Sequence, residues 1–307
     1  MAYEIGMAED TPQELLSEQQ AARARHEYYR DSIEVFDVTP IERLDGVPPL
    51  VLVGGWSQGP KSLTPAVEQF LGQGRRVISF AYGRGGDVFS RPSHYPAVLE
   101  HKAKMIGHAL DELGISDCQM IGHSEGGQVA TIAALHNPER VSGLVLWASG
   151  GLTGPEGVTQ LGRRLIPEVA QHVVRFATDS TSRNAYLRSV HEGAVYVAKN
   201  PLRNYQDGKA IARFDIVKHL QLLRVQGVKV AVLQASHDKI FPAEQIGGRL
   251  ALGVVDAHAS LAVRGATHHE LVLQPEVTSA ALGELLDSLW AMRAQDASSF
   301  LIDLAGR

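Results

Sequence analysis

The sequence has one cysteine and no long apolar run. Cys118 has no second cysteine to pair with, so a disulfide within the chain is excluded and a reducing compartment is expected. No stretch reaches the roughly eighteen unbroken apolar residues of a membrane span, and the first residues lack the basic-then-apolar order of a signal peptide. The sequence therefore predicts a cytoplasmic protein in which Cys118 is a small core residue.

Clusters of positive charge are also missing. The chain carries 29 basic and 34 acidic residues, a formal net charge of −5, and its lysines and arginines occur at most in pairs such as Arg75-Arg76. Nucleic acids and anionic membrane surfaces attract basic patches, so the charge argues against both as partners. The 307 residues, of which 44% are hydrophobic, suffice for one large α/β domain with an insertion or for two domains.

The most informative stretch is residues 119–130. An apolar run ends in Gly122, the turn Gly-His-Ser-Glu-Gly carries Ser124, and a helical run begins at once. On either flank of such a tight turn, the neighbouring chain would occupy the space of a side chain. This steric constraint explains why residues 122 and 126 are glycines. Ser124 would project above the end of a sheet, beside a helix start whose N–H groups favour an oxyanion. The pattern predicts a nucleophile, and the chain must supply its base.

The rest of the core alternates between predicted strands and helices. Apolar runs predict an edge strand at 32–38 and further strands at 50–53, 76–81, 143–148, 228–234 and 260–263. Most of them are separated by stretches of helical spacing. The fold class is therefore α/β, with a mostly parallel, doubly wound sheet whose ligand sites lie beyond the C-terminal ends of the strands.

Two segments fall outside this alternation. Residues 150–220 contain helical stretches and no strand signal, and we interpret them as a helical cap inserted over the site, with a subdomain for oligomerisation as the alternative. Residues 1–31 are polar with a thin apolar face, which favours a helical arm laid on the domain or on a partner subunit, with partial disorder as the alternative. The core would then comprise 32–149 and 221–307, and a second copy of the chain is a candidate partner.

Two further predicted strand ends carry ionisable residues, Asp238 and His268. With Ser124 they follow the chain order Ser, Asp, His. Activation of a serine requires a histidine that takes its proton and a carboxylate that fixes the imidazole tautomer. Three strand-end loops of one twisted sheet can bring such residues together although they are far apart in sequence.

Four segments, in this order, resemble motifs of the α/β-hydrolase superfamily. They are Gly122-His123-Ser124-Glu125-Gly126-Gly127, similar to the family's Gly-His-Ser-x-Gly-Gly; Pro138-Glu139-Arg140-Val141 with the strand that follows; Asp238-Lys239-Ile240-Phe241-Pro242, similar to its Asp-x-x-x-Pro; and Gly265-Ala266-Thr267-His268, similar to its Gly-x-x-His. The resemblance covers about residues 33–295.

The resemblance implies a role for each motif residue. Ser124 would be the nucleophile, His268 the base and Asp238 the acid. Asp256 is the alternative carboxylate, and His269 the alternative base. The backbone N–H groups of Trp56 and Glu125 would form the oxyanion hole. The residues expected to contact substrate are Gly55, Ser57 and His123.

The chain departs from the family pattern in two loops. Gly54-Gly55 stands where the family usually has His-Gly before the first oxyanion donor. The family's Asp-x-x-Gly-x-Gly is replaced by Tyr82-Gly83-Arg84-Gly85-Gly86-Asp87. Both changes concern the packing that positions the oxyanion hole, where a shifted donor costs about 3 kcal/mol of transition-state stabilisation.

These observations predict a serine hydrolase that cleaves a small to medium, largely apolar carboxylic ester through an acyl-serine intermediate. The same triad could instead serve carbon–carbon, thioester, acyl-transfer or cofactor-free haloperoxidase chemistry, and a binding protein on a hydrolase scaffold stays open. The partner would be a small-molecule acyl substrate. We expect no cofactor and no metal, because the adjacent histidines 268 and 269 point in different directions and no His-x-x-x-His spacing exists.

Overall fold

One nine-stranded sheet crosses the described part of the chain. The computed structural model describes residues 25–30, 33–58, 60–82, 95–178, 183–199, 201–269, 272, 275–292 and 300–302. The strand order is β1-β2-β4-β3-β5-β6-β7-β8-β9, in which β1 and β2 run antiparallel to their neighbours and the other strands run parallel. The strands are β1 (Arg25–Arg30), β2 (Ile33–Val38), β3 (Leu50–Val53), β4 (Val77–Tyr82), β5 (Cys118–His123), β6 (Val141–Trp147), β7 (Lys229–Ala235), β8 (Ala259–Val263) and β9 (Phe300–Ile302).

The central strands are buried on both faces. In β3, Val51 and Val53 belong to one hydrophobic core, and Leu50 and Leu52 to the other, because successive side chains of a strand point to opposite faces. This burial explains why β3 is a continuous apolar run, which is typical of parallel sheets covered on both sides.

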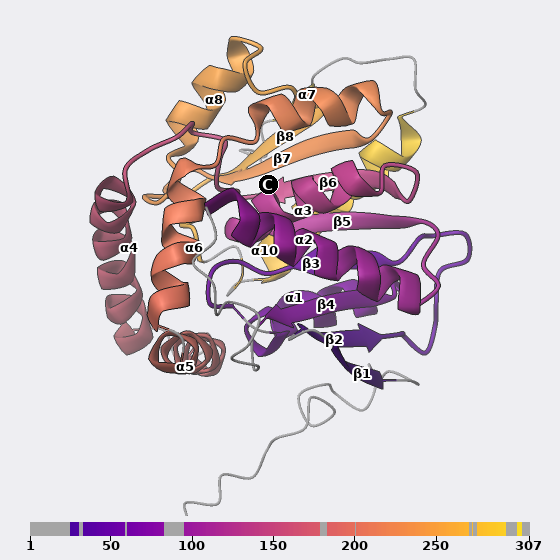
Figure 1. The fold of residues 1–307 in the computed structure, drawn as a ribbon, viewed down its shortest axis with the longest axis horizontal. Helices are drawn as coiled ribbons and strands as arrows, with labels where there is room; N and C mark the ends of the chain where they lie inside the picture. The colour runs from indigo at the N-terminus through magenta and orange to yellow at the C-terminus, as the bar shows by residue number, and fades with distance from the viewer. Residues whose placement is uncertain are drawn as a thin grey trace, which may run out of the picture.

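Helices cover both faces of the sheet (Figure 1). The first core includes residues of α2 (Tyr95–Glu112), α3 (Glu125–His136) and α7 (Val217–Val225), and the second includes residues of α1 (Pro60–Gly72) and α10 (Pro275–Ala291). The short helix α8 (Ala243–Ala251) adds Ile246 to the first core. The predicted doubly wound α/β sheet is confirmed.

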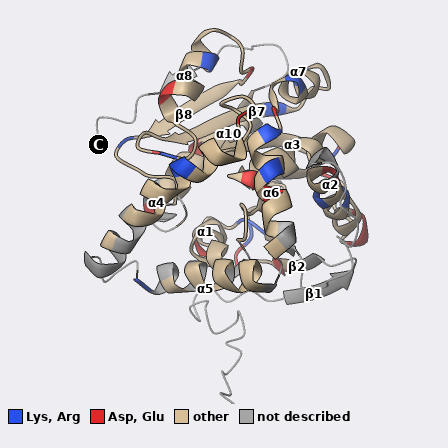
Figure 2. Cartoon of the chain, turned by 60° about the vertical axis from the view of Figure 1, so that its left-hand side comes forward, with Lys and Arg blue, Asp and Glu red and all other residues tan. Residues whose placement is uncertain are grey.

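A helical insertion lies between β6 and α7. It consists of α4 (Val158–Thr178), α5 (Arg183–Lys199) and α6 (Pro201–Arg213), which stand beside the C-terminal edge of the parallel strands (Figures 1 and 2). We refer to these three helices as the cap. The expected cap boundary at residue 220 falls inside α7, which packs against α3 and precedes β7, so the chain returns to the core before that residue.

The prediction of an N-terminal helical arm is wrong for residues 25–30. They form β1, which pairs with β2 from Arg30 opposite Ile33 to Arg25 opposite Val38. The predicted edge strand at 32–38 is therefore covered on its outer side, by a strand rich in charged residues and tyrosine that carries no apolar alternation. The rest of the predicted arm, residues 1–24, lies outside the described residues.

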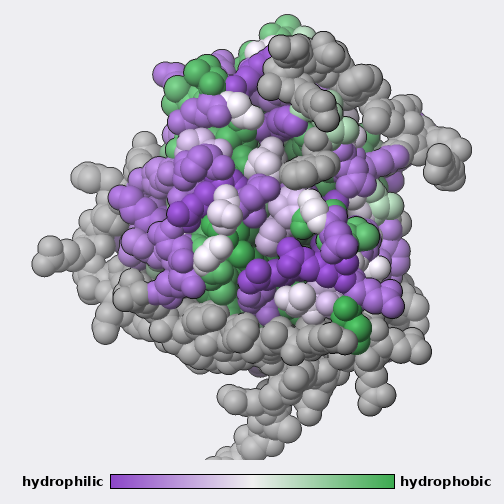
Figure 3. All heavy atoms as spheres, turned by 90° about the vertical axis from the view of Figure 1, so that its right-hand side faces the viewer, coloured by the Kyte–Doolittle hydropathy of each residue, from purple (hydrophilic) through white to green (hydrophobic). Residues whose placement is uncertain are grey.

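The described surface is mixed in charge and hydropathy. Acidic and basic residues are interspersed over the described helices and loops (Figure 2), and hydrophilic residues predominate on the side away from α4 and α5 (Figure 3). Within the described ranges, no helix combines the length and the apolar character that crossing a bilayer requires. The cytoplasmic location stays a prediction.

The environment of Cys118 yields a chemical test of the fold. The residue opens β5 and is completely buried, and this burial raises the pKa of its thiol to about 12. Since the thiolate is the reactive form, we expect negligible reaction of the native protein with a thiol reagent such as DTNB at pH 8. One equivalent should react after denaturation. Rapid stoichiometric labelling of the native protein would contradict the placement of this strand.

Candidate active site

Ser124 occupies a strained turn between β5 and α3. Its backbone angles are φ 56° and ψ −120°, a region that side-chain-bearing residues rarely adopt. The turn is closed by close backbone approach: a Cβ on Gly122 would lie 2.5 Å from the carbonyl oxygen of Gly126, and one on Gly126 would lie 2.2 Å from that of Val53. Only glycine fits at both positions, as the sequence predicts for a nucleophile elbow.

The loop after β3 contacts this turn. A Cβ on Gly55 would lie 2.8 Å from the Cβ of Ser124, so the loop that holds Trp56 and Ser57 borders the serine directly. On the other side α3 begins at Glu125, where helix geometry leaves the first N–H groups without carbonyl partners inside the helix. Both predicted oxyanion donors therefore belong to segments that adjoin Ser124.

Asp238 and His268 are joined by a hydrogen bond. The Nδ1 atom of His268 lies 2.8 Å from Oδ2 of Asp238, and both side chains are almost completely buried. The other carboxylate oxygen, Oδ1, accepts the backbone N–H groups of Ile240 and Phe241, each at 2.8 Å. This turn after β7 fixes the carboxylate, which in turn orients the imidazole.

The surroundings of His268 shift its proton affinity. Burial alone lowers the pKa of the imidazole, but the charge and hydrogen bond of Asp238 raise it, as does the charge of Glu168, and the net pKa lies above the usual value. Because Asp238 engages Nδ1, Nε2 is the ring nitrogen left to exchange a proton with another group.

His123 connects the turn before Ser124 to two other loops. Its Nδ1 lies 2.9 Å from Oε1 of Gln58, and its Nε2 lies 3.4 Å from the backbone carbonyl oxygen of His268. Burial, together with the charges of His268 and His269, lowers its pKa well below the usual value, so the ring is neutral and carries one N–H. The shorter contact assigns this hydrogen to Nδ1, which donates to Gln58.

Gln58 supports the loop that departs from the family's His-Gly pattern. Its Oε1 accepts the backbone N–H of Gly55 at 2.7 Å as well as the contact from His123. The amide therefore ties the glycine pair to the residue before Ser124. Gln58 was not predicted from the sequence, and its place three residues after Gly55 is the signal that could have indicated it.

Ser124, His268 and the loop after β3 line one pocket under the cap. The pocket has a volume of about 300 Å³, at the lower end for small-molecule sites. Its described walls combine the loops after β3, β5 and β8 with apolar residues of the cap and of the loop after β7. The lining residues are Gly55, Trp56, Ser57, Gln58, His123, Ser124, Leu161, Leu165, Val169, Val197, Asn204, Ile211, Ile240, Phe241, His268 and His269. The three residues expected to contact substrate, Gly55, Ser57 and His123, are among them.

The alternative residues are paired elsewhere. Asp256 forms an ion pair with Arg224, and so it does not serve as the carboxylate partner of His268. The Nδ1 atom of His269 lies 3.7 Å from Oε1 of Glu168, whereas Asp238 bonds to His268. Of the two adjacent histidines, the geometry therefore pairs His268 with the acid.

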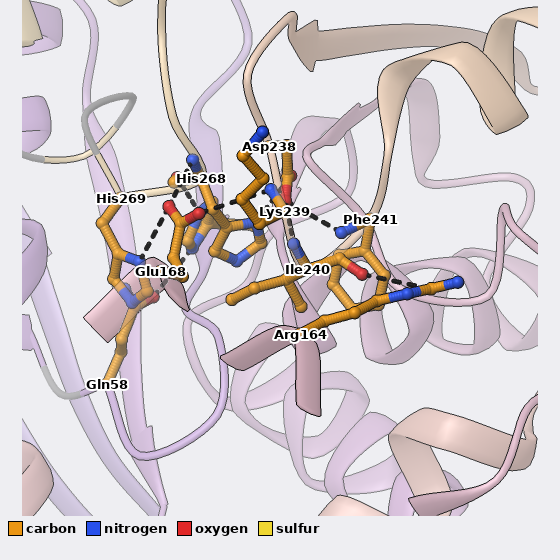
Figure 4. A network of polar contacts seen from close by, with 10 residues as sticks. Gln58, Arg164, Glu168, Asp238, Lys239, Ile240, Phe241, His268 and His269 are labelled. Carbon is orange, nitrogen blue, oxygen red and sulfur yellow. Dashed lines mark hydrogen bonds and ion pairs between the residues drawn. The ribbon is translucent and has the colours of Figure 1, made fainter. Parts of the chain in front are cut away.

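Glu168, a further buried acid beside the site, was not predicted from the sequence. It lies on α4 of the cap, between the loops that carry His268 and Lys239 (Figure 4). It is one of several acids in the insertion, and no local pattern marks it. Among the described residues, no three His, Cys, Asp or Glu side chains are grouped so that they could hold a metal ion.

The sheet order, the turn at Ser124 and the inserted cap define the α/β-hydrolase fold. The profile of the family described as "alpha/beta hydrolase fold" matches residues 48–165. A carboxylesterase structure from the thaumarchaeon Nitrososphaera gargenis superposes with a TM-score of 0.61 at 15% identity, over 87% of this chain and 99% of that one. The chain has the α/β-hydrolase fold, and the resemblance seen in the sequence is confirmed.

Relatives with curated names are similar to much of the chain. A protein of Mycobacterium phage D29 that carries the name of a non-heme haloperoxidase is 27% identical over 64% of this chain and 73% of its own length. The 2-hydroxymuconate semialdehyde hydrolase of Pseudomonas sp. strain CF600 is 27% identical over 65% of this chain and 71% of its own length. The family match and the names of these relatives support a hydrolase of this fold. The substrates of the named relatives differ.

The steric argument for the turn is testable with two alanine substitutions. Gly126→Ala forces a Cβ against the backbone oxygen of Val53, so we expect it to lower the unfolding free energy by about 1–3 kcal/mol or more. Gly247→Ala lies in helix α8 with nothing within 4 Å of the added Cβ and should be neutral or stabilising by up to about 1 kcal/mol. Thermal and urea unfolding measure both. Equal stability of the two variants would contradict the tight turn.

Proposed function

We propose that this protein is a serine hydrolase that cleaves a small, neutral, largely apolar carboxylic ester. The observation that supports this most is that His268, hydrogen-bonded to Asp238, lines the same pocket as Ser124, whose backbone is strained. A buried imidazole with a fixed tautomer beside an accessible serine is the arrangement that makes a hydroxyl nucleophilic.

In the first half of the proposed reaction, Ser124 Oγ attacks the ester carbonyl while Nε2 of His268 takes the hydroxyl proton. Asp238 keeps Nδ1 protonated and stabilises the imidazolium that forms. The oxyanion of the tetrahedral intermediate is bound by the backbone N–H groups of Trp56 and Glu125. The intermediate collapses as the bond from carbon to the alkoxy oxygen breaks and His268 gives its proton to that oxygen, so the alcohol leaves and acyl-Ser124 remains.

The second half of the reaction repeats these steps with water. His268 takes a proton from water, the resulting hydroxide attacks the acyl carbonyl, and the same two N–H groups bind the new oxyanion. His268 then returns the proton to Ser124 Oγ as the carboxylic acid leaves. Each residue ends in its starting state, so the cycle needs no cofactor.

The pocket lining favours a neutral, apolar substrate. The cap contributes Leu161, Leu165 and Val169, and the loop after β7 contributes Ile240 and Phe241. No lysine or arginine is among the described residues that line the pocket, so an anionic group on the substrate would have no full positive charge opposite it there. A pocket of about 300 Å³ fits a short acyl chain with a small alcohol.

Carbon–carbon bond hydrolysis is the second candidate. It is favoured by the similarity to 2-hydroxymuconate semialdehyde hydrolases, which match this chain at 27% identity over 65% of its length in one case. The same serine, histidine and oxyanion donors could act on a ketone carbonyl, but the substrate named for those relatives is an acid, and this pocket favours a neutral molecule.

The nucleophile is tested by substitution of Ser124. A fluorophosphonate probe should label the wild type, and p-nitrophenyl esters of short to medium acids should be hydrolysed. Ser124→Ala should abolish labelling and lower kcat by roughly 10⁶-fold, to the limit of detection. Ser142→Ala is the matched control, because Ser142 lies on β6 and donates to the carbonyl of Cys118 away from the pocket.

The results separate the candidates. Labelling with ester turnover supports the ester hydrolase, and labelling with turnover only of a vinylogous diketone supports carbon–carbon hydrolysis. The absence of both labelling and turnover would contradict the proposal and leave a binding protein on this fold.

The raised pKa of His268 predicts the pH dependence. The base must be neutral to accept a proton, and a pKa above the usual value of about 6.5 keeps the imidazole protonated to a higher pH. The value of kcat/KM should therefore fall as the pH is lowered through an apparent pKa above 6.5. Asp238→Asn should lower kcat by about 10⁴-fold, because the imidazole loses its fixed tautomer. A pH-rate profile with its acid limb below pH 6 would contradict this assignment.

A further inference from the structure

We propose that two buried carboxylates of the cap, Glu168 and Asp207, are positioning residues that hold the two halves of the catalytic machinery. Glu168 holds the loop that carries the base, and Asp207 holds the side chain of the oxyanion residue Glu125 through Lys102. The inference rests on the proposed function, since it assigns these residues to the same site. The cap would then complete the site as well as cover it.

Glu168 is completely buried and faces main-chain donors of both loops that carry the acid and the base. Its Oε1 accepts the backbone N–H of His268 at 2.9 Å, and its Oε2 accepts that of Lys239 at 3.3 Å (Figure 4). Lys239 follows Asp238 directly, so one side chain from α4 holds the residue next to the acid and the base itself. A carboxylate suits two converging N–H donors, because it accepts at both oxygens.

Glu168 also acts on the imidazole through its charge. Among the described residues, the titratable or charged groups that face His268 are Asp238 after β7, Glu168 on α4, His123 at the end of β5 and the adjacent His269. Asp238 and Glu168 are the acids among them, and both raise the pKa of His268, whereas burial lowers it. Removal of the charge at Glu168 should therefore lower the pKa of the base.

Asp207 joins the cap to the other half of the site. It is completely buried on α6, and its Oδ1 lies 3.2 Å from Nζ of Lys102 on α2. The same ammonium group lies 2.6 Å from Oε1 of Glu125, the residue whose N–H would bind the oxyanion. The hydroxyl of Tyr196 on α5 donates to Oδ2 of Asp207 at 2.5 Å.

Asp207, Lys102 and Glu125 form a buried charge cluster, which fixes the side chain of Glu125, the first residue of α3. Three charged groups that are each at most 3% exposed stabilise a fold only while they stay paired, because a buried charge without its partner is strongly destabilising. Any displacement of α6 that moves Asp207 must therefore move Lys102 or Glu125 as well. Since the N–H of Glu125 lies in the same residue, its direction depends on a docked cap.

Substitution of Glu168 separates its charge from its hydrogen bonds. Glu168→Gln keeps an acceptor for the N–H of His268 and removes the charge, so kcat at high pH should stay within about threefold of wild type while the acid limb of the pH-rate profile moves to lower pH. Glu168→Ala removes the acceptor too and should lower kcat by about ten- to a hundredfold through misplacement of the base. If kcat is near the wild-type value in Glu168→Gln but low in Glu168→Ala, while the acid limb is shifted in Glu168→Gln, then Glu168 is a positioning residue.

Substitution of Asp207 should give a different signature. Asp207→Asn keeps the ion pair of Lys102 and Glu125, so the variant should fold. We expect kcat and the rate of fluorophosphonate labelling to fall about tenfold together, because both reactions need the oxyanion donor, while KM stays within about twofold. The acid limb should not move. Tyr196→Phe should change kcat in the same direction by less.

The control is Asp37→Asn. Asp37 is also a buried carboxylate, paired with Arg76 through a contact of 2.8 Å between β2 and the start of β4, and does not line the pocket. The Asp37→Asn substitution should lower the melting temperature without altering kcat or the pH-rate profile. If Glu168→Gln left the acid limb in place, or if Asp207→Asn changed only KM or the melting temperature, the corresponding assignment would be wrong.

An NMR titration of the His268 ring makes the test independent of turnover. The ring signal, assigned by its loss in His268→Gln, should titrate at lower pH in Glu168→Gln than in the wild type. If the wild type neither labels nor hydrolyses esters but the ring titration still shifts, the proposed function fails and the contact from the cap stands. If the wild type is active and neither the ring nor the rate profile shifts, the function stands and the role of Glu168 is overturned.

Discussion

The close approach of main chain around Ser124 is the constraint on which the site depends. Gly126 packs against the carbonyl oxygen of Val53, and Gly55 against Ser124 itself, so β3, β5 and the start of α3 are held within van der Waals contact. The strain in the backbone of Ser124 is stable only because these neighbours determine its position. The same packing brings the loop after β3 next to Ser124, at the N-terminus of α3.

The parts of the fold that were predictable from sequence are those specified by local pattern. The strand at 50–53 is a continuous apolar run and the strand before Ser124 contains the apolar stretch Met120–Gly122, as burial on both faces of a parallel sheet favours. Asp238 and His268 stand directly after such strands, so topology alone placed them at one edge of the sheet. β1 was missed because its Arg, His, Glu and Tyr residues carry no apolar alternation, and its pairing with β2 supplies the order.

The contacts between cap and core were not predictable in the same way. Glu168 and Asp207 are single acids in amphipathic helices, where an acid is ordinarily on the exposed face. Their burial follows from how α4 and α6 dock on the core, which depends on contacts between residues a hundred positions apart or more, such as Glu168 and His268. Lys102 is a similar case. Within α2 it is one charged residue among several, and its role is defined by its ion pairs with Glu125 and Asp207. A pattern along the chain does not contain these pairings.

Two elements hold different polar groups of His268 without competition. Asp238, after β7, binds Nδ1, and Glu168, on α4, accepts the backbone N–H. Because each partner uses a different atom, neither displaces the other, and the ring and main chain of the histidine are fixed together. Nε2 is then the atom of this residue left for proton exchange in the pocket. A general base needs this combination of a fixed residue and one accessible nitrogen, and it is supplied by contacts from both the core and the cap.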